Sequence, residues 1–102
     1  LALWHGFPVS PGHALIVPVR HVASWFDATG EERAEIVDLV DTARDLILRD
    51  RAPDGWNVGM NLGRAAGQTV FHLHIHVIPR YQGDTPNPRG GVRHVIPLKG
   101  NY

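Results

Sequence analysis

The chain has 102 residues, enough for one small domain and too few for two. Lysine plus arginine and aspartate plus glutamate number 10 each, so a net charge of zero gives no electrostatic reason to expect nucleic acid or a membrane surface as a partner. The absence of cysteine excludes disulfides and cysteine-ligated zinc, and no apolar run approaches the ~18 residues of a membrane span. We therefore expect a single cytoplasmic domain over residues 1–102.

The first half of the chain predicts a hairpin followed by one long helix. Residues 1–5 and 13–18 have the character of two strands joined by a turn-rich segment. Thr29 and Glu32 have the spacing of a capping box, which marks the start of a helix. Apolar residues then recur at helical spacing and predict one buried face, made of Ile36, Leu39, Val40, Ala43, Leu46 and Ile47.

The second half predicts three more extended segments, residues 56–61, 69–78 and 92–97, the last being a short strand or an ordered tail. A glycine-punctuated loop, residues 62–68, joins the first two, and residues 83–102 form a tail rich in loops. The order β-β-α-β-β favours an α+β fold, an antiparallel sheet with one long helix packed on a face.

Three histidines, His72, His74 and His76, recur at a spacing of two in the segment 69–78. Alternate side chains of a strand point to opposite faces, so the three imidazoles share one face. The other face carries the apolar residues Phe71, Leu73, Ile75 and Val77. Pro79 is expected to close this strand, because proline cannot donate to a ladder.

Such a row has three interpretations: chance histidines on a solvated face, a zinc or copper site, or phosphoryl chemistry with an imidazole nucleophile. The loop before the row is rich in glycine and ends in small polar residues, which suits an anion. No aspartate or glutamate lies between Gly55 and Gly83 to orient a metal-bound imidazole. The local chemistry therefore favours phosphate over metal.

The run His72-x-His74-x-His76, followed by Val77 and Ile78, resembles the signature of the histidine triad (HIT) superfamily of nucleotide hydrolases and transferases. The segments 67–69 and 11–13 match other positions of the family, so the resemblance covers about residues 3 to 82. It implies a HIT-like layout, a homodimer, and a further N-terminal segment that this chain lacks.

The resemblance also implies roles for the histidines. His74 would be the nucleophile, its Nδ1–H held by the backbone carbonyl of His72 so that Nε2 attacks the α-phosphorus. His76 would contact the phosphoryl or bridging oxygen. His72 and His13 would orient the row, although His13 is as well explained by a hydrogen-bonded histidine without chemistry.

Four further residues are predicted to bind the nucleotide. Gln68 and Thr69 would donate to the developing charge, and Asn61 matches a family position near the ribose and phosphates. His5 stands where family members commonly carry aspartate or asparagine for the ribose hydroxyls, and an imidazole can donate or accept one hydrogen bond. We expect no metal in the triad and no tightly bound cofactor; a divalent metal would enter only with the polyphosphate.

The expected function is hydrolysis at the α-phosphate of dinucleoside polyphosphates or related NMP conjugates through a nucleotidyl-histidine, with water as the acceptor. His76 at the third triad position points to the hydrolase branches, and residues 78–84 resemble the fragile-histidine-triad type. A nucleotidyltransferase or phosphorylase of the same fold stays open. So does a non-catalytic nucleotide- or metal-binding module.

Overall fold

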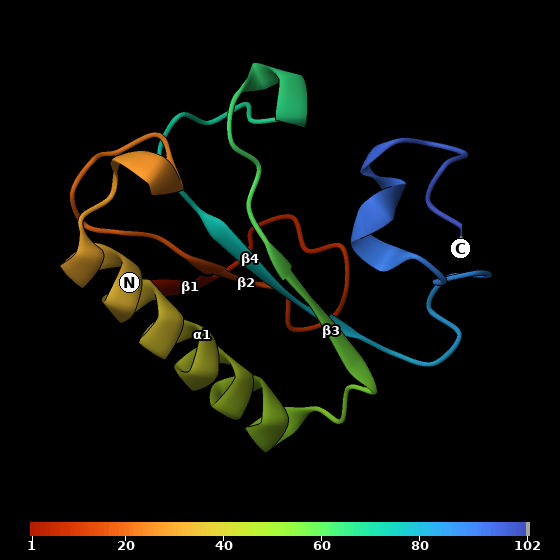
Figure 1. Cartoon of the computed structure of the whole chain (residues 1–102). Coiled ribbons are helices and arrows are strands. Elements are labelled where there is room, and N and C mark those ends of the chain that lie inside the picture. The colour runs from red at the N-terminus through yellow and green to blue at the C-terminus, as the bar shows by residue number, and fades with distance from the viewer. Residues whose placement is uncertain (102) are drawn as a thin grey trace.

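A computed structural model describes residues 1–101, so Tyr102 at the end of the expected domain and tail lies outside the described residues. Over residues 1–101 the chain forms one antiparallel sheet, with a single α-helix across one of its faces (Figure 1). The strands are β1 (Ala2–Trp4), β2 (Ala14–Ile16), β3 (Gly55–Gly59) and β4 (Ile75–Arg80), in the spatial order β1-β2-β4-β3. The predicted α+β fold is confirmed.

The helix α1 (Gly30–Asp50) begins at the predicted capping box. The Thr29 hydroxyl accepts the Glu32 N–H at 3.1 Å, and a Glu32 carboxylate oxygen accepts the Thr29 N–H at 2.9 Å. Three residues of the predicted stripe, Ile36, Ala43 and Ile47, are buried in one cluster with hydrophobic side chains of β2 and β4. Within the described residues, no helix is long and apolar enough to cross a membrane.

The histidine segment differs from the prediction at both ends. Its strand begins at Ile75 instead of residue 69. The neighbouring strand β2 supplies partners only as far as the pair Ile16–Ile75, because β2 ends at Ile16, two residues before Pro18. Upstream of Ile75, the Leu73 N–H donates instead to the Val22 carbonyl. The alternation of buried and half-buried side chains nevertheless continues from His72 to Arg80, through the residues before the strand and the strand itself.

At its other end the strand runs through Pro79 to Arg80, so the expectation that proline closes it is wrong. Arg80 accepts from the backbone of Asp54 on the β3 side, which places the backbone polar groups of Pro79 on the opposite side. There β2 has already ended, and the Ser10 hydroxyl donates to the Pro79 carbonyl at 2.7 Å. The missing N–H of Pro79 therefore costs no ladder bond.

The loop between β1 and β2 is fastened to the end of β4 a second time. The Tyr81 hydroxyl donates to the Pro11 carbonyl at 2.6 Å. On either side of Tyr81, Arg80 and Asp84 form an ion pair at 2.8 Å. The tail then folds on itself with a short 3₁₀-helix at Gly91–Val95, and the alternative of a strand at 92–97 is not realised.

Candidate active site

The sheet face opposite α1 carries the histidines. Along β4 and the residues before it, Leu73, Ile75 and Val77 are buried, whereas His72, His74 and His76 are half-buried. The predicted apolar face is confirmed except at Phe71, which is 42% exposed and lies under the Arg64 guanidinium. Packing of the apolar side chains against α1 thus fixes which way the imidazoles point.

His74 is held in one tautomer by its own backbone. Its Nδ1 lies 2.8 Å from the carbonyl oxygen of His72, which is the contact predicted from the resemblance. A carbonyl only accepts, so Nδ1 carries the proton and Nε2 keeps its lone pair. The His72 ring is itself fixed, because its Nε2–H donates to the Pro18 carbonyl at 2.9 Å. His74 can therefore act as a nucleophile through Nε2.

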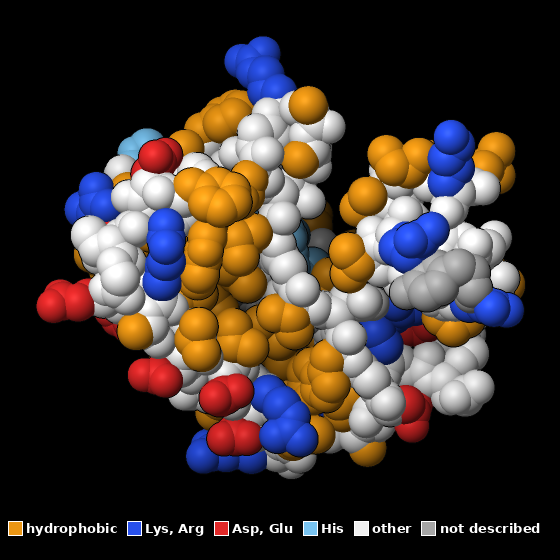
Figure 2. All heavy atoms as spheres, viewed as in Figure 1, with side chains coloured by type: hydrophobic (Ala, Val, Ile, Leu, Met, Phe, Trp, Pro, Cys, Tyr) orange, Lys and Arg blue, Asp and Glu red, His pale blue; other side chains and the backbone are white. Residues whose placement is uncertain are grey.

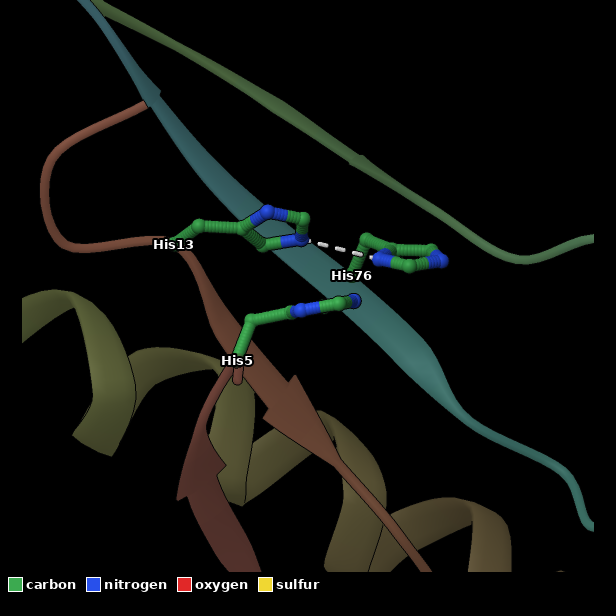
Figure 3. Close-up of side chains that lie close together, drawn as sticks. All are labelled: His5, His13 and His76. Atoms are coloured by element: carbon green, nitrogen blue, oxygen red, sulfur yellow. Dashed lines mark hydrogen bonds between the residues drawn. The ribbon is translucent and has the colours of Figure 1, made fainter. Parts of the chain in front are cut away.

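His76 is held in the opposite tautomer by a chain of donors. The backbone N–H of Val9 donates to Nδ1 of His13 at 3.2 Å, so neutral His13 carries its proton on Nε2. That Nε2–H lies 2.9 Å from Nδ1 of His76 and donates to it (Figure 3). The proton of His76 must then be on Nε2. Neighbouring histidines of the row thus offer a lone pair at His74 and an N–H donor at His76.

Burial keeps this pair of histidines neutral. His13 is 3% exposed, and its pKa falls to about 4 because of burial first and the neighbouring His5 and His76 second. The pKa of His76 is lowered by burial and then by His74 and His5. Near neutral pH both imidazoles therefore hold one proton each, as the tautomer chain requires.

His5 joins His13 and His76 in a three-histidine cluster. The hairpin pairs its backbone with His13, whose carbonyl accepts the His5 N–H at 2.9 Å. The His5 ring centroid lies 4.4 Å from that of His13 and 5.8 Å from that of His76, and Figure 3 shows its ring reaching toward both. The predicted pairing of residues 1–5 with 13–18 brings His5 to His13, whereas the third member, His76, comes from β4 and could not be placed from that pairing.

A cavity of about 340 Å³ opens beside the row, lined by His5, Leu15, Val17, Val70, His72 and His74. Half of the lining residues are aliphatic and half are histidines. Figure 2 also shows histidine atoms in a hollow between the body of the domain and the C-terminal tail, but no residue of the tail lines this cavity. The arrangement suits a ligand with an apolar part and an anionic part.

The HIT domain family matches residues 1–83, which include the histidine row and the strands around it. The chain belongs to the HIT family. A HIT family protein from Bacillus anthracis is 37% identical with a TM-score of 0.77, and the match covers 81% of this chain and 59% of that one. A Zn-bound histidine triad family protein from Mycobacterium smegmatis is 32% identical with a TM-score of 0.75, over 84% and 63%.

Among curated proteins, this HIT chain is 43% identical over 79 residues to a Mycobacterium tuberculosis protein named AP-4-A phosphorylase. That match covers 76% of this chain and 40% of the relative. The chain therefore spans less than two thirds of the length of each of these three relatives.

A zinc-bound relative raises the question whether this HIT chain can hold a metal at its own histidine cluster, where nitrogens of the three rings lie within 4.8 Å of one another. A metal needs a lone pair on each ligating nitrogen. Nδ1 of His5 accepts the Phe7 N–H at 2.8 Å and Nδ1 of His13 accepts that of Val9, so both Nε2 atoms carry protons. The donor set does not fit a divalent cation.

The side-chain amide of Gln68 is engaged within the protein. It is 4% exposed; both amide hydrogens donate to carbonyls, of Ala23 at 2.9 Å and of Val70 at 3.2 Å, and its oxygen accepts the Gly63 N–H. It therefore fixes the loop before the row, and donation to a phosphate, which stays a prediction, would require a bond to Ala23 or Val70 to break.

The other two predicted nucleotide-binding residues remain at the surface. Asn61 and Thr69 are exposed, and neither is among the residues that line the cavity beside the row. Their contacts with a nucleotide stay predictions.

Proposed function

We propose that this HIT protein is a nucleotide hydrolase that cleaves at the α-phosphate of dinucleoside polyphosphates or related NMP conjugates. The observation that supports it is the pair of opposite tautomers: a lone pair on Nε2 of His74 and an N–H on Nε2 of His76. Nε2 of His74 attacks phosphorus, and the Nε2–H of His76 donates to the oxygen on which charge develops.

In the first step Nε2 of His74 forms a bond to the α-phosphorus, and the bond from phosphorus to the bridging oxygen breaks. Nδ1–H stays on the His72 carbonyl, which stabilises the positive charge gained by the ring. In the second step water attacks the α-phosphorus, the P–N bond breaks, and a proton passes to solvent. A single oxyanion donor such as the N–H of His76 is typically worth roughly 3–4 kcal/mol of barrier.

The neutral His13–His76 pair also bears on the leaving group. His76 can donate a hydrogen bond, but giving up its only proton would leave an imidazolate, because His13 cannot replace it without losing the acceptor role of its Nδ1. The site therefore favours a leaving group that is stable as an anion. A nucleoside polyphosphate meets this requirement, whereas an amine does not.

The test is a trapped intermediate. A fluorogenic adenylate ester, mixed rapidly with the protein and quenched in alkali, should leave one nucleotidyl group on His74, detectable by mass spectrometry of the peptide. His74→Asn should abolish both label and turnover while AMP still binds. Wild-type turnover by His74→Asn would refute the assignment.

A phosphorylase is the second candidate, and the 43% identity to the protein named AP-4-A phosphorylase favours it. In that reaction phosphate replaces water, so the site needs a cation for the incoming anion. Arg80 is engaged with Asp84 and with the Asn57 side-chain oxygen at 2.6 Å, which supports water. Reaction in oxygen-18 water with excess phosphate decides: label in AMP means hydrolysis, and ADP without labelled AMP means phosphorolysis.

We also propose a homodimer. β3 is an edge strand, and Val58 on it is 45% exposed toward the side of the sheet that packs on α1. Figure 2 shows hydrophobic side chains gathered between α1 and β3, where Leu39, Val40, Trp56 and Met60 are only partly buried. Association would bury this strip, which a small domain covers poorly by itself.

A further inference from the structure

His5 holds an N–H that the fold does not use. Its Nδ1 accepts the backbone N–H of Phe7, so the proton of the neutral ring is on Nε2. Among residues 1–101 no protein acceptor forms a hydrogen bond with that Nε2, whereas His13, His72 and His74 each have a partner for their proton. A half-buried donor without a protein partner is available to a ligand.

The position of His5 shows which part of a ligand it would meet. The aliphatic side chains of Leu15, Val17 and Val70 in the lining of the cavity beside the row suit a base. His5 lines the same cavity as His74, and its ring stacks on that of His76, with 5.8 Å between the centroids and an angle of 19° between the planes. It therefore stands beside His76, the histidine that is expected to contact the phosphoryl oxygen.

We propose that His5 binds substrate by donating its Nε2–H to a phosphoryl oxygen, and that the site does not select ribose over deoxyribose. This inference rests on the proposed nucleotide function and names a contact within it. His5 cannot accept a hydrogen bond from a ribose hydroxyl, because its lone pair is taken by the Phe7 N–H.

The rest of the cavity supports the second half of the proposal. Recognition of a ribose diol normally uses side-chain acceptors for the hydroxyl protons. The cavity lining contains no carboxylate or carboxamide, and the Nε2 of His72 is committed to the Pro18 carbonyl. Loss of the sugar hydroxyls should therefore leave few protein groups unpaired.

Two variants isolate the donor. His5→Phe keeps a flat ring and removes the N–H, while His5→Gln keeps a donor at similar reach. AMP, 2′,3′-dideoxy-AMP and adenosine are titrated calorimetrically into each protein. Because a hydrogen bond to a charged group contributes about 1.5–3 kcal/mol, His5→Phe should lower the affinity for AMP about 10-fold or more. It should weaken dideoxy-AMP equally and leave adenosine unchanged, and His5→Gln should recover most of the AMP affinity.

Three results would overturn the proposal: equal weakening of adenosine and AMP, weakening of AMP without weakening of dideoxy-AMP, or stoichiometric zinc binding that His5→Phe abolishes. The first two would assign His5 to the nucleoside, and the third to a metal. Because these titrations involve no turnover, a failed intermediate at His74 leaves them interpretable, and their failure leaves the intermediate assay intact.

Discussion

Replacing Gln68 with methionine separates a role in holding the loop from a role in binding phosphate. Methionine has a similar length and no hydrogen-bonding amide. The variant removes three bonds: to the Gly63 N–H at 2.8 Å and to the carbonyls of Ala23 and Val70 at 2.9 Å and 3.2 Å. With the side chain 4% exposed, water cannot easily replace them.

Each such bond contributes about 0.5–1.5 kcal/mol net, so three give about 3 kcal/mol of the free energy of unfolding. For a domain of this size 1 kcal/mol shifts Tm by roughly 4–8 °C, and the variant should melt roughly 12–24 °C below wild type. A typical domain stability of about 5–15 kcal/mol would still leave it folded at low temperature.

The assay is thermal denaturation followed by circular dichroism, with Thr69→Val as the matched control because Thr69 is the exposed neighbour. Calorimetric titration at low temperature then compares AMP with adenosine. We expect a large loss of Tm for Gln68→Met and an unchanged ratio of the two affinities. An unchanged Tm together with a selective loss of AMP binding would show that Gln68 leaves the loop to reach the phosphate.

Four further predictions follow from the geometry. Gly59 pairs with His76 across the sheet, and no atom lies within 4 Å of a Cβ added there, so Gly59→Val should fold normally. Its side chain would occupy the imidazole face and should lower kcat/KM at least about 10-fold. Gly55→Val, at the far end of β3, should not lower it, and equal activities of the two variants would refute this prediction. Because the folded pKa of His13 is about 4 and its ordinary value is 6.5, the unfolded chain takes the proton first. The contribution of His13 to the free energy of unfolding should be constant above about pH 6.5, fall by about 1–3 kcal/mol toward pH 4 and change no further below, and a series of melts between these pH values should show a weaker slope for His13→Gln. Val58→Glu should shift the mass found by light scattering from that of a dimer to that of a monomer. A monomeric wild type at micromolar concentration would refute the proposed homodimer. Chelator should leave hydrolysis of the fluorogenic ester unchanged, and stoichiometric zinc lost together with activity would reverse the assignment of a metal-free triad.

Much of the fold could be predicted because its signals are periodic and local. The capping box at Thr29 and the spacing of Ile36, Ala43 and Ile47 define α1 without any knowledge of its neighbours. The alternation at His72–His76 defines the two faces even where no ladder forms. The start of β4 could not be predicted, because it depends on how far β2 extends.

The tautomers and the role of Gln68 were less accessible, since both depend on backbone groups distant in sequence. Val9, Pro18 and Ala23 contribute only a main-chain N–H or carbonyl, which any residue type could supply. The Nδ1 contact of His74 is the exception: its partner is two residues away, and the resemblance implied it.

The loop from β1 to β2 has a consequence for how such a domain can vary. Surface loops normally accept insertions and deletions at little cost. This one is fastened by Ser10 to Pro79 and by Pro11 to Tyr81, and directly before those two residues it carries the Val9 N–H that sets the proton on His13. Adding one residue would move the Val9 N–H, free His13 to change tautomer, and exchange donor for acceptor at His76. The length of this loop therefore sets whether Nε2 of His76 donates or accepts a hydrogen bond. Chains that keep every histidine but change the loop length should differ in this property of their third triad histidine.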